Sequence, residues 1–356
     1  MSNFIEVLIK RPQNSICYNL DIMSDFVESV KNTFSDISDF KILFAIKANP
    51  DLRVLQKLSE KGIGADCASM EELHLAKVAG FEYISVTNPG LNGEEIREII
   101  QQGIDFDFDN IVQIEDSLVT KSEIGLRINL KIVDSRFGFA FDNGCIEFLK
   151  KAKLTIKRLH IHFGNKNECN IVKMREEIVH IIKKYDFLHQ IECINLGGGY
   201  EYLFAHGHIE LLKDSIRQIK NSVEVFLNRN IQIVIEPGSL LAYPLGYLKP
   251  NVKYVYGDKV YLGVSNFNLS SWNPIYPLMH NGKNITNKEK RYKFCLYGNT
   301  CYEEDCFGEY EFNENIKKGD SLILFPVGAY NYNLIRNLHA MEPPEIIYFE
   351  NGILYD

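Results

Sequence analysis

Eight short apolar runs, each ending in a polar residue or a glycine, recur every ~20 to 40 residues over the first two thirds of the chain. Segments with helical spacing separate them, and alternation of this kind is typical of a (β/α)8 barrel. The expected strands span residues 41–47, 62–69, 83–89, 104–110, 123–129, 158–164, 191–199 and 231–238. The sequence therefore predicts an α/β fold built on a TIM barrel.

Barrel enzymes assemble their sites where the strands end, and the expected strand ends carry reactive side chains. The set comprises Lys47, Asp66, Asn88, Arg127, His162, Gly197, Gly198, Gly199 and Glu236. Because the strand ends meet at one face of a barrel, we predict a single site there. It would combine an amine, an imidazole, a carboxylate and a stretch of glycine backbone.

Helical patterns follow the first two expected strands. Leu52, Leu55 and Leu58 recur every three residues after the first strand, which predicts a helix with these leucines on one side. Ser69 and Glu72 have the spacing of a capping box and predict the start of the next helix.

The chain is longer than a barrel requires. Its 356 residues exceed a barrel of about 250 residues by roughly a hundred, so a second domain is expected. After about residue 241 alternating apolar runs occur, and Asn351-Gly352 predicts a type I′ hairpin. The segment EVLI (6–9) is also strand-like and is expected to join this domain. We therefore predict a barrel over residues 21–240 and a β domain made of residues 1–20 and 241–356.

Composition limits the classes of function. A net charge of −8 and a pI near 5.7 disfavour broad nucleic-acid binding, which needs clustered Lys and Arg. The apolar runs are too short for a signal peptide or a membrane span, so a cytoplasmic protein without membrane partners is expected. The eight cysteines include no CxxC pair, which predicts mostly buried free thiols and no metal site.

Four of the strand-end features together indicate pyridoxal 5′-phosphate (PLP). Lys47 ends an apolar strand, where desolvation would make its amine a nucleophile toward carbonyls. The backbone of residues 197–199 would let a phosphate approach closely. Glu236 could keep a pyridine nitrogen protonated while His162 stacks on the ring. Taken singly, a strand-end lysine usually extends to solvent and a run of glycines usually marks a tight turn.

Seven motifs, in the same order and over nearly the full length, resemble those of the fold-type III PLP-dependent decarboxylases. This family includes the ornithine, diaminopimelate and carboxynorspermidine decarboxylases. The motifs are FAIKANP around Lys47, GADCASMEEL with Asp66, HIHFGN with His162, LGGGY at 196–200, EPG with Glu236, GNTCYEED with Cys301 and Asp305, and GAY with Tyr330.

The resemblance implies catalytic roles for four residues. Lys47 would hold PLP covalently, His162 would stack on its ring, and Glu236 would pair with the ring nitrogen. Cys301 would return a proton to the α-carbon after carbon dioxide leaves. In the family the cysteine loop completes the site of a neighbouring subunit, so the resemblance also implies a homodimer with shared active sites.

The remaining matched positions would bind or support the cofactor. By resemblance the phosphate would be held by Gly197, Gly198, Gly199 and Tyr330, with Asn165 and Ser239 beside it. Asp66 and Arg127 would support the pocket, although a charge pair at a barrel rim can be purely structural.

The sequence departs from the family pattern at the phosphate. The family's EPGR is EPGS here, so Ser239 stands where an arginine would be. A charge-assisted hydrogen bond contributes ~1.5 to 3 kcal/mol, and its loss would weaken cofactor binding about ten- to a hundredfold. Asn165, where a serine is usual, would compensate in part. Carboxynorspermidine decarboxylases also lack this arginine.

A second departure concerns the far end of the substrate. Ornithine decarboxylases place aspartates at the positions that correspond to Tyr302 and Asn273, where they bind a distal ammonium. We expect Tyr302, Asn273 and Asp305 to line the substrate site. A plain diamine precursor is therefore disfavoured, and Glu303 or Glu304 would have to supply any replacement charge.

The sequence thus predicts PLP-dependent decarboxylation of an amino acid, or of an amino-acid-derived group, other than plain ornithine or lysine. The substrate could be a carboxylated polyamine, a siderophore or antibiotic intermediate, or an amino-acyl group on a carrier. Two alternatives stay open. One is an amino-acid racemase of the same fold, which would need a tyrosine base opposite Lys47. The other is a non-catalytic decarboxylase-like regulator, which Ser239 alone favours.

Overall fold

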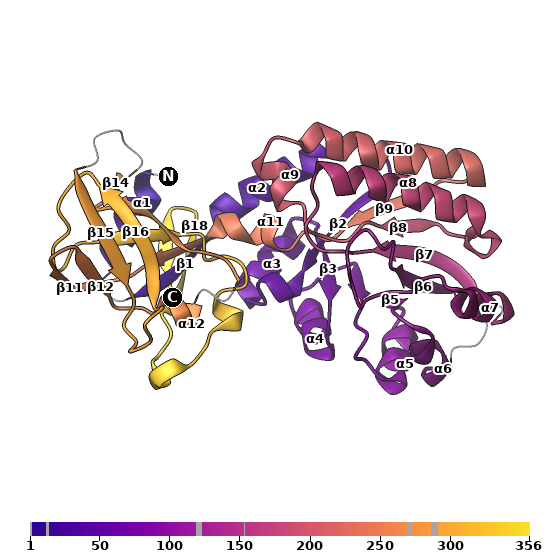
Figure 1. The fold of residues 1–356 in the computed structure, drawn as a ribbon, viewed down its shortest axis with the longest axis horizontal. Coiled ribbons are helices and arrows are strands. Elements are labelled where there is room, and N and C mark those ends of the chain that lie inside the picture. The colour runs from indigo at the N-terminus through magenta and orange to yellow at the C-terminus, as the bar shows by residue number, and fades with distance from the viewer. Residues whose placement is uncertain (1, 12–13, 119–122, 153, 270–271, 286–290) are drawn as a thin grey trace. The chain divides into compact units, whose positions relative to one another are not determined.

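The structure is a computed structural model that describes residues 2–11, 14–118, 123–152, 154–269, 272–285 and 291–356. These residues form two compact units, Val27–Leu240 and Met1–Phe26 with Leu241–Asp356 (Figure 1). Each unit is described by itself.

A closed barrel of eight parallel strands forms the core of the first unit. All eight strands expected from the sequence are present, which confirms the predicted TIM barrel. They are β2 (Phe40–Ala45), β3 (Gly64–Cys67), β4 (Ile84–Val86), β5 (Asp105–Phe108), β6 (Glu123–Ile128), β7 (Thr155–Ile161), β8 (Cys193–Asn195) and β9 (Gln232–Ile235). The pairing of β2 with β9 closes the barrel. The first strand ends two residues earlier than expected, so Lys47 lies in a short 3-10 turn, Ile46–Ala48.

Helices follow the strands around the barrel (Figure 1). They are α2 (Leu20–Thr33), α3 (Leu52–Glu60), α4 (Met70–Val78), α5 (Gly93–Gln101), α6 (Ile111–Asp116), α7 (Asn143–Lys151), α8 (Glu168–Lys184), α9 (Glu201–Ala205), α10 (Ile209–Leu227) and α11 (Ser239–Ala242). Helix α2 begins and helix α11 ends in the other unit.

Of the two local predictions for these helices, the one for the start of α4 needs correction. In α3 the buried stripe is Val54, Leu55 and Leu58, whereas Leu52 is 36% exposed. Asp51 caps the helix by accepting the Val54 N–H, which makes Leu52 its first residue. Ser69 does cap α4 by accepting the Glu72 N–H, but the Glu72 carboxylate accepts from Ala68 rather than Ser69. The capping box is therefore only half formed.

The second unit contains two sheets. Their strand orders are β14-β13-β17-β10-β1-β18-β19 and β11-β12-β15-β16. The strands are β1 (Ser15–Asn19), β10 (Gly246–Lys249), β11 (Val252–Tyr256), β12 (Lys259–Leu262), β13 (Tyr276–His280), β14 (Lys283–Asn284), β15 (Tyr292–Tyr297), β16 (Cys306–Phe312), β17 (Leu322–Phe325), β18 (Glu345–Glu350) and β19 (Ile353–Tyr355). Helices α1 (Ser2–Leu8) and α12 (Asn266–Leu269) accompany them.

The N-terminal segment joins this sheet through a different strand from the one predicted. Strand β1 pairs with β10 and β18, whereas the segment EVLI lies mainly in helix α1. Phe4, Ile5 and Leu8 are buried, and this spacing places them on one helical face. The Phe4 ring packs against those of Tyr247 and Phe349. Burial of this face decides in favour of helix, because a short apolar run is compatible with either structure.

The predicted C-terminal hairpin is confirmed. Strands β18 and β19 pair antiparallel across Asn351 and Gly352. Both turn residues have positive φ, 52° and 80°, as a type I′ turn requires.

All eight cysteines are free thiols, but the prediction that most are buried is wrong. Only Cys17, Cys67 and Cys145 are buried, while Cys169 and Cys301 are exposed and the other three are partly exposed. Among the described residues no helix has the length and apolar character needed to cross a bilayer.

Gly125 in β6 makes room for buried charges of the neighbouring strands, because it pairs with Asp107 of β5 and Arg158 of β7. A Cβ at this position would lie 1.9 Å from Asp107 Oδ1. We expect Gly125→Ala to lower the free energy of unfolding by roughly 1–3 kcal/mol, measured by urea denaturation.

Gly144→Ala is the matched control, because a Cβ there would make only an ordinary contact, 3.5 Å from Asp142 Oδ1. In helix α7 this change should be neutral or stabilise by up to about 1 kcal/mol. Equal effects of the two substitutions would contradict the steric argument.

Candidate functional site

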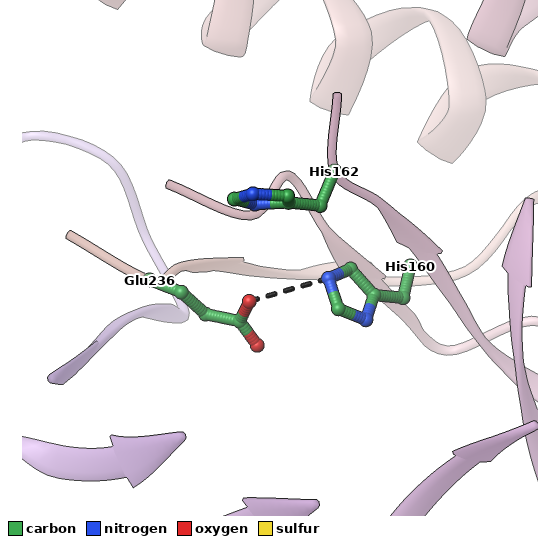
Figure 2. A group of neighbouring side chains, drawn as sticks. All are labelled: His160, His162 and Glu236. Carbon is green, nitrogen blue, oxygen red and sulfur yellow. Dashed lines mark ion pairs between the residues drawn. The ribbon is translucent and has the colours of Figure 1, made fainter. Parts of the chain in front are cut away.

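Two predicted residues and one unexpected residue lie together inside the barrel. Glu236 follows β9 directly, while His160 and His162 lie at the end of β7 (Figure 2). One ligand atom from each of the three lies within 4.8 Å of the others. The His160 Nε2 and Glu236 Oε2 atoms form a buried ion pair at 3.2 Å, and both side chains are 3% exposed.

Further charges extend this ion pair through the barrel. The other ring nitrogen of His160 lies 3.2 Å from Asp107, which also accepts from the Arg158 guanidinium at 2.6 Å. Arg158 contacts Asp105 as well. The four residues Glu236, His160, Asp107 and Arg158 thus alternate in charge, which is the arrangement that buried ions require.

The network sets the charge of its members. Burial opposes protonation of His160, but the charges of Glu236 and Asp107 outweigh burial and raise its pKa to about 9. Burial likewise opposes ionisation of Glu236, but the His160 charge and a hydrogen bond from Asn195 lower its pKa. At neutral pH the pair is therefore an imidazolium and a carboxylate.

His162 is neutral, in contrast to the protonated His160. Desolvation and the nearby charges of Lys166 and Lys47 lower its pKa well below 6.5, so its ring is neutral at neutral pH. Its Nδ1 accepts the N–H of Gly198 at 3.0 Å, and Arg127 donates to its backbone carbonyl at 3.4 Å. These bonds hold the ring above the Glu236–His160 pair in the view of Figure 2.

The glycine segment differs from the expected phosphate cradle. The N–H of Gly197 is bonded to the Asn195 side chain and that of Gly198 to His162. Within the described residues only the Gly199 amide of the three is left without a protein acceptor. The glycines are required sterically, since a Cβ on Gly198 would lie 2.4 Å from the Glu236 carbonyl and one on Gly199 2.1 Å from that of Gly164.

Lys47 lies near the site but is not buried, so the predicted desolvation of its amine is wrong for this structure. Its charge lowers the pKa of three neighbours, Asp66, Glu72 and His162. Asp66 is buried, and burial together with the Glu236 charge raises its pKa. Lys47 is therefore an exposed amine near a carboxyl that is readily protonated.

The other predicted positions in the barrel unit vary in their surroundings. Arg127 is buried and paired with Asp109 at 3.5 Å, a partner that the sequence did not suggest. Asn165 is exposed and its carbonyl accepts from Asn170. Ser239 is half-buried at the first position of α11.

Asp305 organises the cysteine loop in the other unit. Its carboxylate is buried and accepts from the backbone N–H of Phe267 and from both the N–H and hydroxyl of Thr300. The carboxylate expected to bind substrate is therefore occupied within its own loop. Cys301 is exposed on this loop, and its N–H donates to His339 at 3.1 Å.

Tyr302, Asn273 and Tyr330 also belong to the second unit. Tyr302 is 40% exposed and its hydroxyl donates to Glu304. Asn273 is half-buried. Tyr330 has a positive φ of 57° and its ring lies 4.7 Å from that of Trp272.

Sequence reasoning missed His160, Asp107, Arg158 and Lys166. Residues 158, 160 and 162 are spaced by two on one strand, as are 105 and 107 on another. In a strand such residues share one face. Charges recurring at this spacing in otherwise apolar barrel strands were the signal that could have found the network.

The chain matches known proteins over most of its length. A family model for the pyridoxal-binding domain of pyridoxal-dependent decarboxylases matches residues 23–243. Diaminopimelate decarboxylase of Bacillus methanolicus is 24% identical over 387 aligned residues, which cover 94% of this chain and 87% of that protein. These matches confirm the resemblance inferred from the motifs.

Two solved structures share the fold. Diaminopimelate decarboxylase from Helicobacter pylori, complexed with L-lysine, has a TM-score of 0.82 at 20% identity, covering 99% of this chain and 95% of that one. Carboxynorspermidine decarboxylase from Campylobacter jejuni, complexed with norspermidine, has a TM-score of 0.78 at 20% identity, with 97% and 96% covered.

The residues of this barrel face fit PLP, the cofactor of the matched family. The ionised Glu236 suits a protonated pyridine nitrogen, the neutral His162 suits an aromatic face, and the Gly199 amide is available to an anion. A protonated His160 offers no lone pair, so His160, His162 and Glu236 suit an organic ring better than a metal ion.

The His160 network predicts a pH dependence of stability. Folding raises the pKa of His160 from 6.5 to about 9, so its contribution is complete below pH 6.5 and is lost as pH rises through about 9. In PLP-free protein the lowered pKa of Lys166 acts in the opposite direction over part of this range, so the loss is read from the difference in free energy of unfolding between wild type and His160→Gln, which should shrink by up to about 3 kcal/mol in urea denaturation.

His160→Gln should lack the His160 contribution to the pH dependence between pH 6.5 and 9, whereas His206→Gln, at an exposed histidine, should retain it. A His160→Gln protein with the wild-type slope would show that another group titrates.

Proposed function

Because the chain belongs to the pyridoxal-dependent decarboxylase family, we propose that it removes carbon dioxide from an amino-acid centre whose side chain is not that of free ornithine or lysine. The His160–Glu236 ion pair is the observation that carries this proposal. It keeps a buried carboxylate ionised where a cofactor ring needs one.

Residues of the barrel unit would hold PLP and govern its charge. When bound, PLP supplies an electron-accepting ring for the negative charge that develops at the α-carbon. Glu236 would hold the proton at the ring nitrogen, and His160 supports it by keeping Glu236 ionised. His162, neutral and fixed by Gly198 and Arg127, would lie against the ring face.

Lys47 would provide the amine that binds the cofactor covalently. Its position in the turn after β2 suits exchange with an incoming substrate amine, because the side chain is exposed. Asp66 has a raised pKa through burial and the charge of Glu236, so this carboxyl could accept or release a proton near Lys47.

Cys301 would donate the proton that replaces the lost carboxylate on the α-carbon. The exposure of its thiol and the ordering of its loop by Asp305 support this role. We further propose a homodimer in which this loop completes the site of the partner, as the family resemblance implies.

The substrate proposal depends on Tyr302. By the family resemblance, its phenol and the half-buried Asn273 would stand where a carboxylate clamp is needed for a distal ammonium. A buried cation without a partner costs several kcal/mol. A larger substrate that brings its own acidic or extended group, such as a diaminopimelate or a carboxylated polyamine, fits better.

The substrate proposal is tested by incubating the PLP-loaded protein with L-ornithine, L-lysine, meso-diaminopimelate and carboxynorspermidine and measuring released carbon dioxide. We expect the better of meso-diaminopimelate and carboxynorspermidine to have a kcat/KM about a hundredfold higher than ornithine or lysine, because an unpaired buried cation carries a penalty of this size. Tyr302→Asp should raise activity on ornithine, and Lys47→Ala should abolish all release. Efficient wild-type turnover of ornithine or lysine would refute the substrate proposal alone.

Shared sites predict complementation between two inactive variants. Lys47→Ala and Cys301→Ala chains should regain up to about a quarter of wild-type activity when refolded together, because random pairing makes about half of the dimers mixed, each with one intact site. Mass spectrometry should verify the mixed dimers. Mixed dimers without activity would place both residues in the site of a single subunit.

A further inference from the structure

Lys166 carries a fully buried amine packed against the glycine segment. Its side chain is 0% exposed, and its Nζ donates to the Gly198 carbonyl. Its backbone N–H donates to the Gly199 carbonyl at 2.7 Å. The rings of Phe163 and Tyr200 lie 4.8 Å from Nζ. Lys166 therefore bonds to both Gly198 and Gly199, the two residues joined by the peptide unit that carries the Gly199 N–H.

In the part of the chain that the structure describes, this amine has no anionic partner of its own. Within the described residues no carboxylate lies within 4.0 Å of the Lys166 Nζ, whereas the comparably buried Lys220 is paired with Glu224 at 2.8 Å. The two carboxylates whose charges reach Lys166 are already bonded. Glu201 accepts the Leu240 N–H at 2.9 Å, and Glu236 is paired with His160.

An unpaired buried cation is unfavourable unless an anion joins it. Burial lowers the pKa of Lys166 to about 7, with Glu201 and Glu236 partly opposing the shift. A phosphate dianion near the Gly199 amide would favour the protonated lysine, and the lysine would in turn favour the phosphate. The charge of Lys166 already reaches His162 on the other side of the segment.

We propose that Lys166 supplies the positive charge that balances the phosphate of PLP, from behind the glycine segment. It thereby takes the place of the guanidinium that Ser239 cannot provide. Lys166 is a positioning residue, because its hydrogen bond to the Gly198 carbonyl also fixes the segment that presents the Gly199 amide. The proposal rests on the proposed function only in that PLP must bind.

The test compares PLP with pyridoxal, which lacks the phosphate. Dissociation constants for both are measured on apoprotein by absorbance titration, without any turnover. In Lys166→Gln the preference for PLP over pyridoxal should fall about ten- to a hundredfold, because one charge-assisted interaction with the phosphate is lost. Lys166→Arg should retain most of the preference.

Control variants separate charge from structure. Lys220→Gln, which removes a buried but paired ammonium, should leave the preference unchanged. Lys166→Met, which keeps the apolar stem beside Phe163 and Tyr200, should behave like Lys166→Gln. Adding Ser239→Arg to Lys166→Gln should restore most of the lost preference.

One outcome would contradict the role of Lys166, and another would contradict the proposed function. Equal weakening of PLP and pyridoxal in both Lys166→Gln and Lys166→Met, or an unchanged preference, would reduce Lys166 to a structural residue and overturn this inference. Failure of the wild-type protein to bind PLP would instead refute the proposed function.

Discussion

The ion pair between His160 and Glu236 governs the charge inside the barrel. A lone carboxylate in this position would be neutralised by protonation, because burial raises the pKa of acids. His160 prevents this only because Asp107 and Arg158 balance its own charge from the other side. Removing one member would leave an uncompensated buried charge, at a cost of about 3–5 kcal/mol. The carboxylate at one end of the site therefore depends on residues deep in the barrel.

The glycine segment connects Glu236 with His162 and Lys166. Its Gly197 carbonyl accepts the N–H of Glu236 at 2.8 Å, while the Gly198 amide donates to His162 and the Gly198 carbonyl accepts from Lys166. A side chain on Gly198 or Gly199 would collide with neighbouring backbone. The same few atoms thus fix the carboxylate, the imidazole and the buried ammonium relative to one another, which a flexible loop could not do.

Much of the fold was predictable because most of its elements have apolar patterns long enough to define them. The expected strand at 231–238 contains the apolar run 233–235 directly before Glu236, and such runs are typical of parallel strands buried on both faces. The segment EVLI was mispredicted because four apolar or acidic residues carry no usable period, and only the packing of Phe4, Ile5 and Leu8 makes it a helix. Long patterns determine an element, whereas short ones depend on their neighbours.

For the site, the sequence by itself determined which residue types stand at the strand ends, and with them the match to a pyridoxal-dependent family. Only the tertiary structure decided their states. Lys47 proved exposed, two of the three glycine amides proved occupied, and Lys166 proved buried with no carboxylate of the described residues within 4.0 Å of its Nζ. The physical reason is that burial, protonation and hydrogen bonding depend on atoms brought together from β5, β7, β8 and β9. Their separation along the chain is too large for local sequence spacing to encode these contacts.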